Sequence, residues 1–284
     1  MLESLLSSLP GEFRDYYEPF LGGGAFYFAL KAARKAEHAF LNDLNGELID
    51  TYVAVRDHAD DVIQALRRMD RAYKRTSLQE DFYYSIRSAR PRSKVRRAAR
   101  FIFLNKTCYN GLYRVNRKGV FNVPFGRYVN PTICYEANLR LASNALSGAG
   151  LTAVDFKKAL SGVREGDLVY LDPPYFPLSQ TANFTGYTAG KFGLAEQEEL
   201  ASEFERLGRI GAYVILSNAS HQTMDMLYGG KGYDITEVRA RRIINCDATG
   251  RGPVTEIIVR NYADTSNAGS LPDIEASARP SILQ

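Results

Sequence analysis

The residues best suited to chemistry lie in Asp167–Tyr175, which reads DLVYLDPPY. The apolar residues 168–171 are typical of a buried strand, and they are followed at once by an acid, two prolines and a tyrosine. Proline has no backbone N–H and restricts φ, so the strand must end at Asp172. A buried strand that ends in a carboxylate, a rigid corner and an aromatic ring indicates a site.

The four residues of this corner can hold an amine. Two acceptors can take the two hydrogens of one amine. They are the Asp172 carboxylate and the Pro173 carbonyl, whose direction is set by the rigid Pro173-Pro174 corner. Its lone pair then points outward, while Tyr175 offers a flat ring on which a planar base can stack. This arrangement suits attack by an exocyclic amine on an activated methyl group. A simple strand-ending turn would need neither the acid nor the ring.

A glycine-rich segment, Glu18-Pro19-Phe20-Leu21-Gly22-Gly23-Gly24, lies where a first predicted strand turns into a helix. Glycines let a ligand approach the backbone, and a helix N-terminus supplies free N–H groups. The spacing matches neither the dinucleotide fingerprint nor the P-loop. A tight turn without a ligand is the alternative interpretation.

Acidic residues follow two more predicted strands. Asp43 is placed to accept both hydroxyls of a ribose, although it could equally cap a helix. Asp155 could accept from an adenine amine while Phe156 covers the ring, and its alternative is again a helix N-cap. Because the carboxyl ends of parallel strands share one edge of a sheet, these positions together predict a ligand that carries a nucleoside.

The elements that must position these residues alternate between strands and helices, which predicts a parallel α/β sheet. Strands are expected at residues 16–21, 38–41, 151–154, 168–171, 212–216, 233–242 and 254–260, and helices at 25–35, 47–69, 194–207 and 220–228. Residues 70–105 are expected to be helical and basic, and residues 106–128 to form a β-hairpin with Asn-Gly and Lys-Gly turns. The domains expected are a catalytic domain at 1–56 and 149–262, an insert at 57–148 and a flexible tail at 263–284.

Charge is concentrated in the insert. Phe82–Tyr135 contains twelve Lys or Arg and no acid, so its net charge is +12. Since the whole chain has a net charge of +4, the rest of the chain has a net charge of −8. A solvated face is the plain interpretation, but the interleaved aromatic residues favour nucleic acid. Three cysteines without a CxxC pair predict neither a disulfide framework nor a metal site, and they fit a reducing cytoplasm. No apolar run approaches the length of a membrane span, and no obligate protein partner is evident.

Five segments in this order, EPFLGGG, LNDLN, NGLYRVNRKGVFNVPFGRY, DPPY and SQTANFTGY, resemble the Dam-type DNA adenine methyltransferases, the alpha group or D12 class of amino methyltransferases. The resemblance covers residues 17–262 and implies a Rossmann-like class I methyltransferase sheet with an inserted helical and β-hairpin DNA-recognition domain. It implies a bacterial or phage cytoplasmic enzyme. This enzyme would move a methyl group from S-adenosylmethionine to a flipped adenine of duplex DNA, within GATC.

The resemblance also implies roles for individual residues. Those expected to bind the cofactor are Glu18, Phe20, Gly22, Gly24, Asp43, Asp155, Phe156 and Asp172. The corner that holds the adenine is expected to be Asp172, Pro173, Pro174 and Tyr175, closed over by a loop with Asn183, Phe184 and Tyr187. The DNA-binding residues implied are Tyr109 as a wedge, Leu112, Arg114 and Pro124 as base readers, and Asn110, Asn116, Asn122 and Arg127 as shaping or phosphate contacts.

One family segment has no counterpart here. Family members usually open with Lys-Trp-x-Gly-Gly-Lys, which folds over the donor, whereas this sequence has no Trp. A DNA-binding relative with impaired catalysis therefore stays an alternative. Methylation of the cytosine amine is a second, because it uses the same pocket, and a protein glutamine or RNA substrate is a third, which the basic insert disfavours.

Overall fold

The computed structural model describes residues 1–116, 118–175, 192–240 and 254–263, which fall into two compact units. The first unit comprises Met1–Leu21, Ala33–Asn42 and Val154–Asp273. The second comprises Gly22–Ala32 and Asp43–Ala153 among the described residues, and the predicted insert at 57–148 lies within it. The domain boundaries expected from the sequence stay a prediction.

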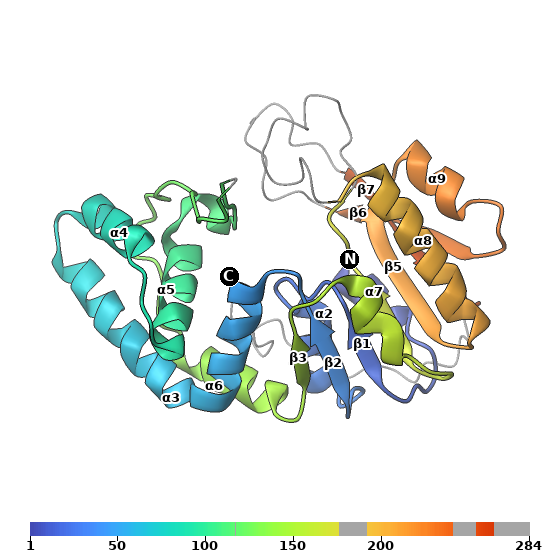
Figure 1. Ribbon diagram of the computed structural model, residues 1–284, viewed down its shortest axis with the longest axis horizontal. Helices are drawn as coiled ribbons and strands as arrows, with labels where there is room; N and C mark the ends of the chain where they lie inside the picture. Colours follow the sequence, from blue (N-terminus) through green and yellow to red (C-terminus); the bar gives the residue numbers. More distant parts are fainter. Residues whose placement is uncertain (117, 176–191, 241–253, 264–284) are drawn as a thin grey trace. The chain divides into compact units, whose positions relative to one another are not determined.

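The sheet has seven strands in the order β3-β2-β1-β4-β5-β7-β6 (Figure 1). Its strands are β1 Tyr16–Glu18, β2 Ala39–Asn42, β3 Gly150–Thr152, β4 Leu168–Leu171, β5 Tyr213–Ala219, β6 Asp234–Ala240 and β7 Val254–Arg260. β1 pairs in parallel with β2 and β4, and β4 with β5, whereas β7 is antiparallel to both β5 and β6. This mixed, mostly parallel α/β sheet is Rossmann-like and confirms the predicted fold class.

One apolar cluster of the first unit lies on one face of the sheet. Its helices are α1 Leu2–Ser7, α7 Phe156–Ala159, the 3-10 turn η2 Leu160–Gly162, α8 Leu194–Arg209 and α9 Gln222–Tyr228. Every second residue of β4 and β5, such as Leu171 and Leu216, packs with Leu200 and Phe204 of α8 in one apolar cluster. Figure 1 shows α8 lying along β5. Since successive strand residues point to opposite faces, the alternate residues of these strands project away from this cluster.

The second unit is mainly helical. It contains α2 Ala25–Ala32, α3 Gly46–Arg75, α4 Gln79–Ser88, α5 Lys94–Thr107, the 3-10 turn η1 Tyr109–Gly111 and α6 Glu136–Leu146. α3 is capped by the Asn45 side chain, which accepts from the Leu48 N–H, and it is kinked at His58 (φ −140°, ψ 40°). α3 packs against α5 (Figure 1). The Tyr73 and Phe103 rings of these two helices meet edge to face, with their centroids 5.7 Å apart.

The predicted β-hairpin at 106–128 is only partly correct. Two isolated antiparallel bridges, Cys108 with Phe125 and Val115 with Phe121, join its arms, but the described residues of this segment form no regular strand. The positive φ of Asn110 (53°) and Gly111 (61°) interrupts the extended backbone that a strand needs. Loop hydrogen bonds replace the ladder, including Tyr109 N–H to the Pro124 carbonyl at 2.9 Å.

Three other expectations concern the chain as a whole. No helix among the described residues is long and apolar enough to cross a membrane. Cys108 and Cys134 are free thiols, while Cys246 lies outside the described residues. Nearly all of the predicted flexible tail, from residue 264 onward, is also outside them.

Candidate functional site

The acid of the DPPY corner is held by the neighbouring strand. β4 and β5 run in register from Leu168 beside Tyr213 to Leu171 beside Leu216, so that Asp172 follows next to Ser217. The Ser217 hydroxyl donates to Asp172 Oδ1 at 2.7 Å, and the Tyr170 hydroxyl lies 3.0 Å from Ser217 Oγ. One carboxylate oxygen of Asp172 is therefore fixed by Ser217, the residue directly after the predicted end of the neighbouring strand at Leu216.

β1 places a second polar pair on the same face of the sheet. The Tyr16 hydroxyl donates to Glu18 Oε2 at 2.7 Å, and both residues are buried. Burial raises the pKa of Tyr16, and the adjacent Glu18 carboxylate raises it further. Glu18, which was expected to bind the cofactor, therefore has at least one partner within its own strand.

The surroundings of Asp172 bring the pKa of its carboxyl group toward neutral pH. The residue as a whole keeps solvent exposure, but its carboxyl group is packed among protein atoms, and this loss of water raises the pKa of Asp172 to about 6. The Glu256 carboxylate of β7 raises it too, whereas hydrogen bonds from Ser217 and Tyr175 oppose the rise. Asp172 is thus mainly a carboxylate acceptor at pH 7, yet it gains a proton just below that pH.

Tyr175 turns its hydroxyl toward this acid. Burial raises the pKa of Tyr175, and the carboxylates of Asp172 and Glu256 raise it further. The hydroxyl shares hydrogen bonds with Asp172 and Ser217, so the phenol is neutral and acts as a donor. The predicted stacking of a base on the Tyr175 ring stays a prediction.

The proline corner is attached to α8. Gln197, in the first turn of α8, donates through Nε2 to the Pro174 carbonyl at 3.2 Å. Its Oε1 accepts from Asn218 Nδ2 of β5 at 3.4 Å. Gln197 and Asn218 are both fully buried, and Pro173 is buried as well. The sequence interpretation missed Ser217, Asn218 and Gln197.

An aromatic cluster flanks the end of β1. The Phe20 ring lies 5.5 Å from that of Phe156 and 5.5 Å from that of Phe192, a residue that sequence reasoning missed. Asp155 is the N-cap of α7 and accepts from the Lys157 N–H at 2.9 Å, as its alternative interpretation stated. The structure therefore brings Phe20 and Phe156 together, and it gives Asp155 a capping bond through one carboxylate oxygen.

In the second unit, Asp43 holds the glycine turn. Its Oδ2 accepts from the Gly22 N–H at 2.9 Å, and its Oδ1 accepts from the Asn45 N–H at 2.8 Å. Gly22 and Gly24 have φ of 47° and 67°, a left-handed backbone that favours glycine. Burial raises the pKa of Asp43, and the two N–H donors oppose the rise. The turn and the acid expected to contact one ligand are thus in direct contact.

The predicted base reader Arg114 is paired inside its own loop. Its Nε donates to Asn122 Oδ1 at 2.8 Å, and its Nη2 donates to the Asn122 carbonyl at 3.3 Å. Asn116 Oδ1 accepts from the N–H groups of Lys118 and Val120, which shapes the turn between the two arms. Asn122 and Asn116 were expected to shape this loop or to contact phosphates, and that role stays a prediction.

The remaining predicted DNA contacts are found on the same loop, hereafter the reading loop, residues 108–128. Tyr109 is 40% exposed, Pro124 is exposed, and the Arg127 side chain is 79% exposed, with Glu80 at 3.6 Å. Leu112 is half-buried and lines a pocket of about 10 Å³, which holds about one water molecule. This pocket is too small to hold a base. The side of Leu112 that lines the pocket therefore faces protein atoms.

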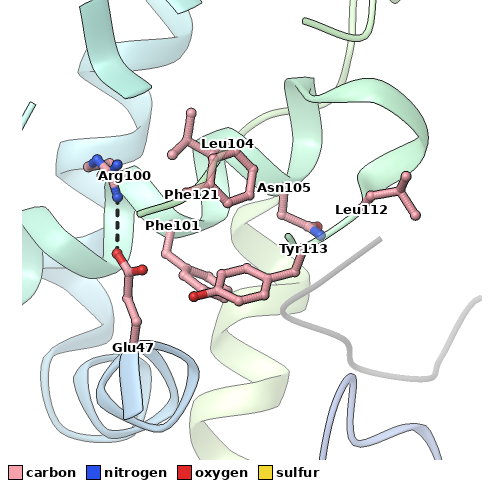
Figure 2. Close-up of a pocket in the computed structure, with 8 residues that line it drawn as sticks. All are labelled: Glu47, Arg100, Phe101, Leu104, Asn105, Leu112, Tyr113 and Phe121. Atoms are coloured by element: carbon pink, nitrogen blue, oxygen red, sulfur yellow. Dashed lines mark hydrogen bonds and ion pairs between the residues drawn. The ribbon is translucent and has the colours of Figure 1, made fainter. Parts of the chain in front are cut away.

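Not all of the positive charge in the insert is free for a polyanion. Arg100 is buried, and its Nη1 donates to Glu47 Oε1 at 3.0 Å, across the small pocket drawn in Figure 2. Its other donors bind the carbonyls of Ile86 and Arg87. Arg100 is therefore part of the core of the second unit.

A shallow groove of about 570 Å³ adjoins the reading loop. It is lined by Lys106, Tyr128, Val129, Pro131, Thr132 and Tyr135. Partial burial lowers the pKa of Lys106 to about 8, so this amine is still mainly protonated at pH 7. The position of Lys106 in the last turn of a basic helix was the signal that could have singled it out.

Two sequence predictions remain, one on the closing loop and one on metal binding. The predicted closing loop with Asn183, Phe184 and Tyr187 lies outside the described residues. Among the residues that the structure does describe, no group of three or more His, Cys, Asp or Glu could hold a metal ion.

Comparison with known proteins places the chain in a family. Residues 1–244 match the model of the D12 class N6 adenine-specific DNA methyltransferases. The chain is 37% identical over 264 residues to the type II methyltransferase M1.LlaDCHI of Lactococcus lactis subsp. cremoris, covering 90% of this chain and 89% of the relative. It is 38% identical over 278 residues to M.MjaIII of Methanocaldococcus jannaschii, covering 92% and 95%.

A third relative carries the name that the sequence motifs suggested. The DNA adenine methylase of Escherichia coli K12 is 35% identical over 243 residues, which cover 85% of this chain and 84% of that protein. The family match agrees with the Rossmann-like sheet. The chain therefore belongs to the D12 class of N6 adenine-specific DNA methyltransferases.

Proposed function

We propose that this protein transfers the methyl group of S-adenosylmethionine to the exocyclic amine of adenine in duplex DNA, within the sequence GATC, in the cytoplasm. Family membership supports the reaction and the type of base. The observation that carries the role of Asp172 is the hydrogen bond from Ser217 to its Oδ1. A carboxylate has about four acceptor positions, so Asp172 can still accept an amine hydrogen beside its bonds with Ser217 and Tyr175. The donor, the sequence GATC and the cytoplasm are proposed from the likeness of the sequence motifs to the Dam-type enzymes.

The chemistry assigned to the corner is the orientation of the amine. Asp172 accepts one amine hydrogen, the Pro173 carbonyl accepts the other, and the nitrogen lone pair is then directed away from both. S-adenosylmethionine, when bound, supplies an electrophilic methyl group. With a pKa of about 6, Asp172 accepts as a carboxylate at neutral pH and can take up the proton that the amine loses.

The residues proposed for the donor fit a nucleoside. Each oxygen of Asp43 accepts one N–H, which leaves a further lone pair on each for a ribose hydroxyl. Asp155 uses one oxygen as a helix cap, so the other can accept from an adenine amine, and Phe156 beside Phe20 offers an aromatic face. Gly22 and Gly24 are proposed to line the methionine end, where a Cβ would hinder a close approach.

The target site is proposed from the reading loop. An amine inside a duplex is inaccessible to the corner, so the adenine must be extruded, with the exposed ring of Tyr109 inserted in its place. Leu112, Arg114 and Pro124 are proposed to read GATC, and residues 57–148 are proposed as the recognition domain. The exposed Arg127 and the groove with Lys106 supply cations for phosphates.

The test is transfer of a tritiated methyl group to synthetic duplexes followed by nucleoside analysis. Four substrates separate the readings: a GATC duplex, duplexes with one substituted base pair, a GATC duplex already methylated on both adenines, and a single strand. The expected product is N6-methyladenine in the unmethylated GATC duplex, with the substituted and methylated duplexes labelled far less.

Each other outcome contradicts a stated part of the proposal. N4-methylcytosine would replace adenine by cytosine as the target. Equal labelling of GATC and substituted duplexes would refute the assigned site but keep the reaction. GATC binding without label, although the protein binds S-adenosylmethionine, would indicate a DNA-binding relative that does not catalyse transfer.

A further inference from the structure

The end of β5 carries two polar residues where an apolar strand would be expected. Ser217 and Asn218 are both fully buried, and they follow the apolar run from Val214 to Leu216. A buried hydroxyl or amide destabilises the fold unless it is hydrogen-bonded. Both side chains have partners, and the bonds of both lead to the DPPY corner.

Ser217 reaches the corner from the face opposite to the apolar cluster. A hydroxyl has one hydrogen to donate, and Ser217 donates it to Asp172 Oδ1 at 2.7 Å. The bond between the Ser217 and Tyr170 hydroxyls, at 3.0 Å, must then be donated by Tyr170. The chain of donors therefore runs from Tyr170 through Ser217 to Asp172, which fixes the direction of the carboxylate.

Asn218 reaches the corner from the other face. Its Nδ2 donates to Gln197 Oε1 at 3.4 Å, and Gln197 Nε2 donates to the Pro174 carbonyl at 3.2 Å. Gln197 itself sits firmly, because its N–H closes the first turn of α8 on the Gly193 carbonyl at 3.1 Å. This relay holds the backbone of the corner, whereas Ser217 holds its carboxylate.

We infer that Ser217 and the Gln197–Asn218 relay are positioning residues for the amine acceptors, with Ser217 orienting the Asp172 carboxylate and the relay orienting the Pro173-Pro174 backbone. This inference rests on the proposed function, since it concerns the same site. None of the three residues is required to touch the adenine. A misplacement of about 1 Å at a reacting group can slow a reaction by about 10²-fold, so such support matters for the rate.

The two supports differ in their effect on the proton affinity of Asp172. The groups facing this carboxylate are Ser217 of β5, Tyr170 of β4, Glu256 of β7, and Tyr175, with Tyr16 and Glu18 of β1 beyond Tyr170. Ser217 stabilises the carboxylate, and its removal leaves only the Tyr175 hydrogen bond to oppose the effects of burial and Glu256 on the pKa of Asp172. Loss of the relay changes no group that donates to the carboxylate.

The experiment compares Ser217→Ala and Gln197→Met with wild type in kcat, KM for each substrate, and the pH profile. We expect kcat to fall by about 10- to 100-fold in Ser217→Ala and about 10-fold in Gln197→Met, with the donor KM nearly unchanged. In Ser217→Ala the acidic limb of the kcat–pH profile moves to higher pH, and in Gln197→Met this limb stays in place. Ser217→Thr, which keeps the hydroxyl, restores most of the rate and the limb.

Ser202→Ala is the matched control, because that exposed serine of α8 donates to the Glu198 carbonyl of its own helix. This variant should leave all constants unchanged. Tyr170→Phe is the second variant should Ser217→Ala fail to fold, with a smaller shift of the limb in the same direction. A kcat within twofold of wild type in Ser217→Ala, or an equal shift of the limb in both variants, would overturn the inference.

A readout without turnover separates this inference from the proposed function. The carboxyl carbon of Asp172, followed by ¹³C NMR across pH 4–8, should titrate at higher pH in Ser217→Ala than in wild type. The same titration in Gln197→Met should match wild type. If wild type methylates no DNA but the titrations differ as expected, the proposed function fails alone, whereas identical titrations in Ser217→Ala and wild type overturn the positioning role.

Discussion

The acceptor corner and the reading loop hold their functional side chains in opposite ways. At the corner, the links join distant parts of the chain: Ser217 binds Asp172, and Gln197 binds Pro174. The linking side chains are buried. In the reading loop, by contrast, Arg114 is held by Asn122 only eight residues away, and Asn116 binds N–H groups two and four residues along.

The difference matches the roles proposed for the two regions. Acceptors that orient a reacting amine gain from a rigid frame built by several elements. The loop backbone is anchored to α4, where Tyr83 and Arg87 donate to the Val123 carbonyl, but Arg114 and Asn116 are held by local bonds, so these side chains can change without disturbing the sheet. Substitutions at the corner should therefore alter the reaction rate, and substitutions in the reading loop should alter the choice and binding of DNA.

The largest effect should follow from Asp172→Ala. Loss of an acceptor at the reacting amine is expected to lower kcat by roughly 10²-fold or more, while the Kd for DNA changes little. Single-turnover methyl transfer and fluorescence anisotropy with the same duplex measure both quantities. A variant that keeps near wild-type turnover would contradict the assignment of Asp172, and a lost affinity for DNA would contradict the separation of the two regions.

Arg114→Ala should give the complementary result. A bidentate arginine on guanine contributes about 1–3 kcal/mol of discrimination, so the preference for GATC over substituted sites should fall by about 5- to 150-fold. Competition binding at several salt concentrations measures it. Residues 82–135 alone carry twelve basic residues, so the background attraction to DNA should hardly change. An equal loss at all sites, with the salt slope reduced by about one unit, would instead make Arg114 a phosphate contact.

Asp172→Asn should raise stability although it lowers activity. The pKa of Asp172 is raised to about 6 in the folded protein, so above pH 6 the ionised carboxylate destabilises the fold. Tm should therefore rise in the variant, by on the order of 2–4 °C at pH 7.5. The rise is modest because solvent screens part of the penalty of the ionised carboxylate. As pH falls from 6 toward 4, the folded wild type takes up its proton first and the difference should disappear. Thermal melts across pH 4–8 test this, and a pH-independent difference would contradict it.

The smallest effect is expected for Asn116→Ala. In this variant two N–H groups lose their acceptor at an exposed turn. The ordered conformation of the reading loop should be destabilised by about 0.5–1 kcal/mol, which should lower the affinity for DNA by about 2- to 5-fold. Tm should be unchanged because these bonds stabilise only the loop. Anisotropy titrations and melts measure both, and a lower Tm would show that the turn supports the fold of the second unit.

The regular elements of the sheet could be predicted closely because their residues carry an unambiguous pattern. β4 has the bounds expected from its apolar run, and β6 and β7 lie within one or two residues of their predicted ends. β5 was predicted to end at Leu216, but it continues to Ala219. Hydrophobicity cannot find such an extension, because the last residues of β5 are polar and are buried only through partners elsewhere in the chain.

The site residues divide along the same line. Asp172 and Asp43 could be singled out because they follow predicted strands, and a position after a strand is visible in the sequence; their roles stay predictions. Gln197 appears in the sequence as an ordinary surface residue of an acidic helix, and only the contact with Pro174 shows its place. The hairpin expected around Arg114 was only partly correct, because the positive φ of residues 110 and 111 interrupts its first arm.

The alternation along β5 also limits which changes this protein can accumulate over generations. Ser217 and Asn218 face opposite sides of the sheet, so removal of one residue between Tyr213 and Leu216 would exchange their directions. The hydroxyl would then point toward α8 and the amide toward Asp172. Substitutions in this strand leave the alternation intact, so we expect its length to tolerate far less variation than its composition.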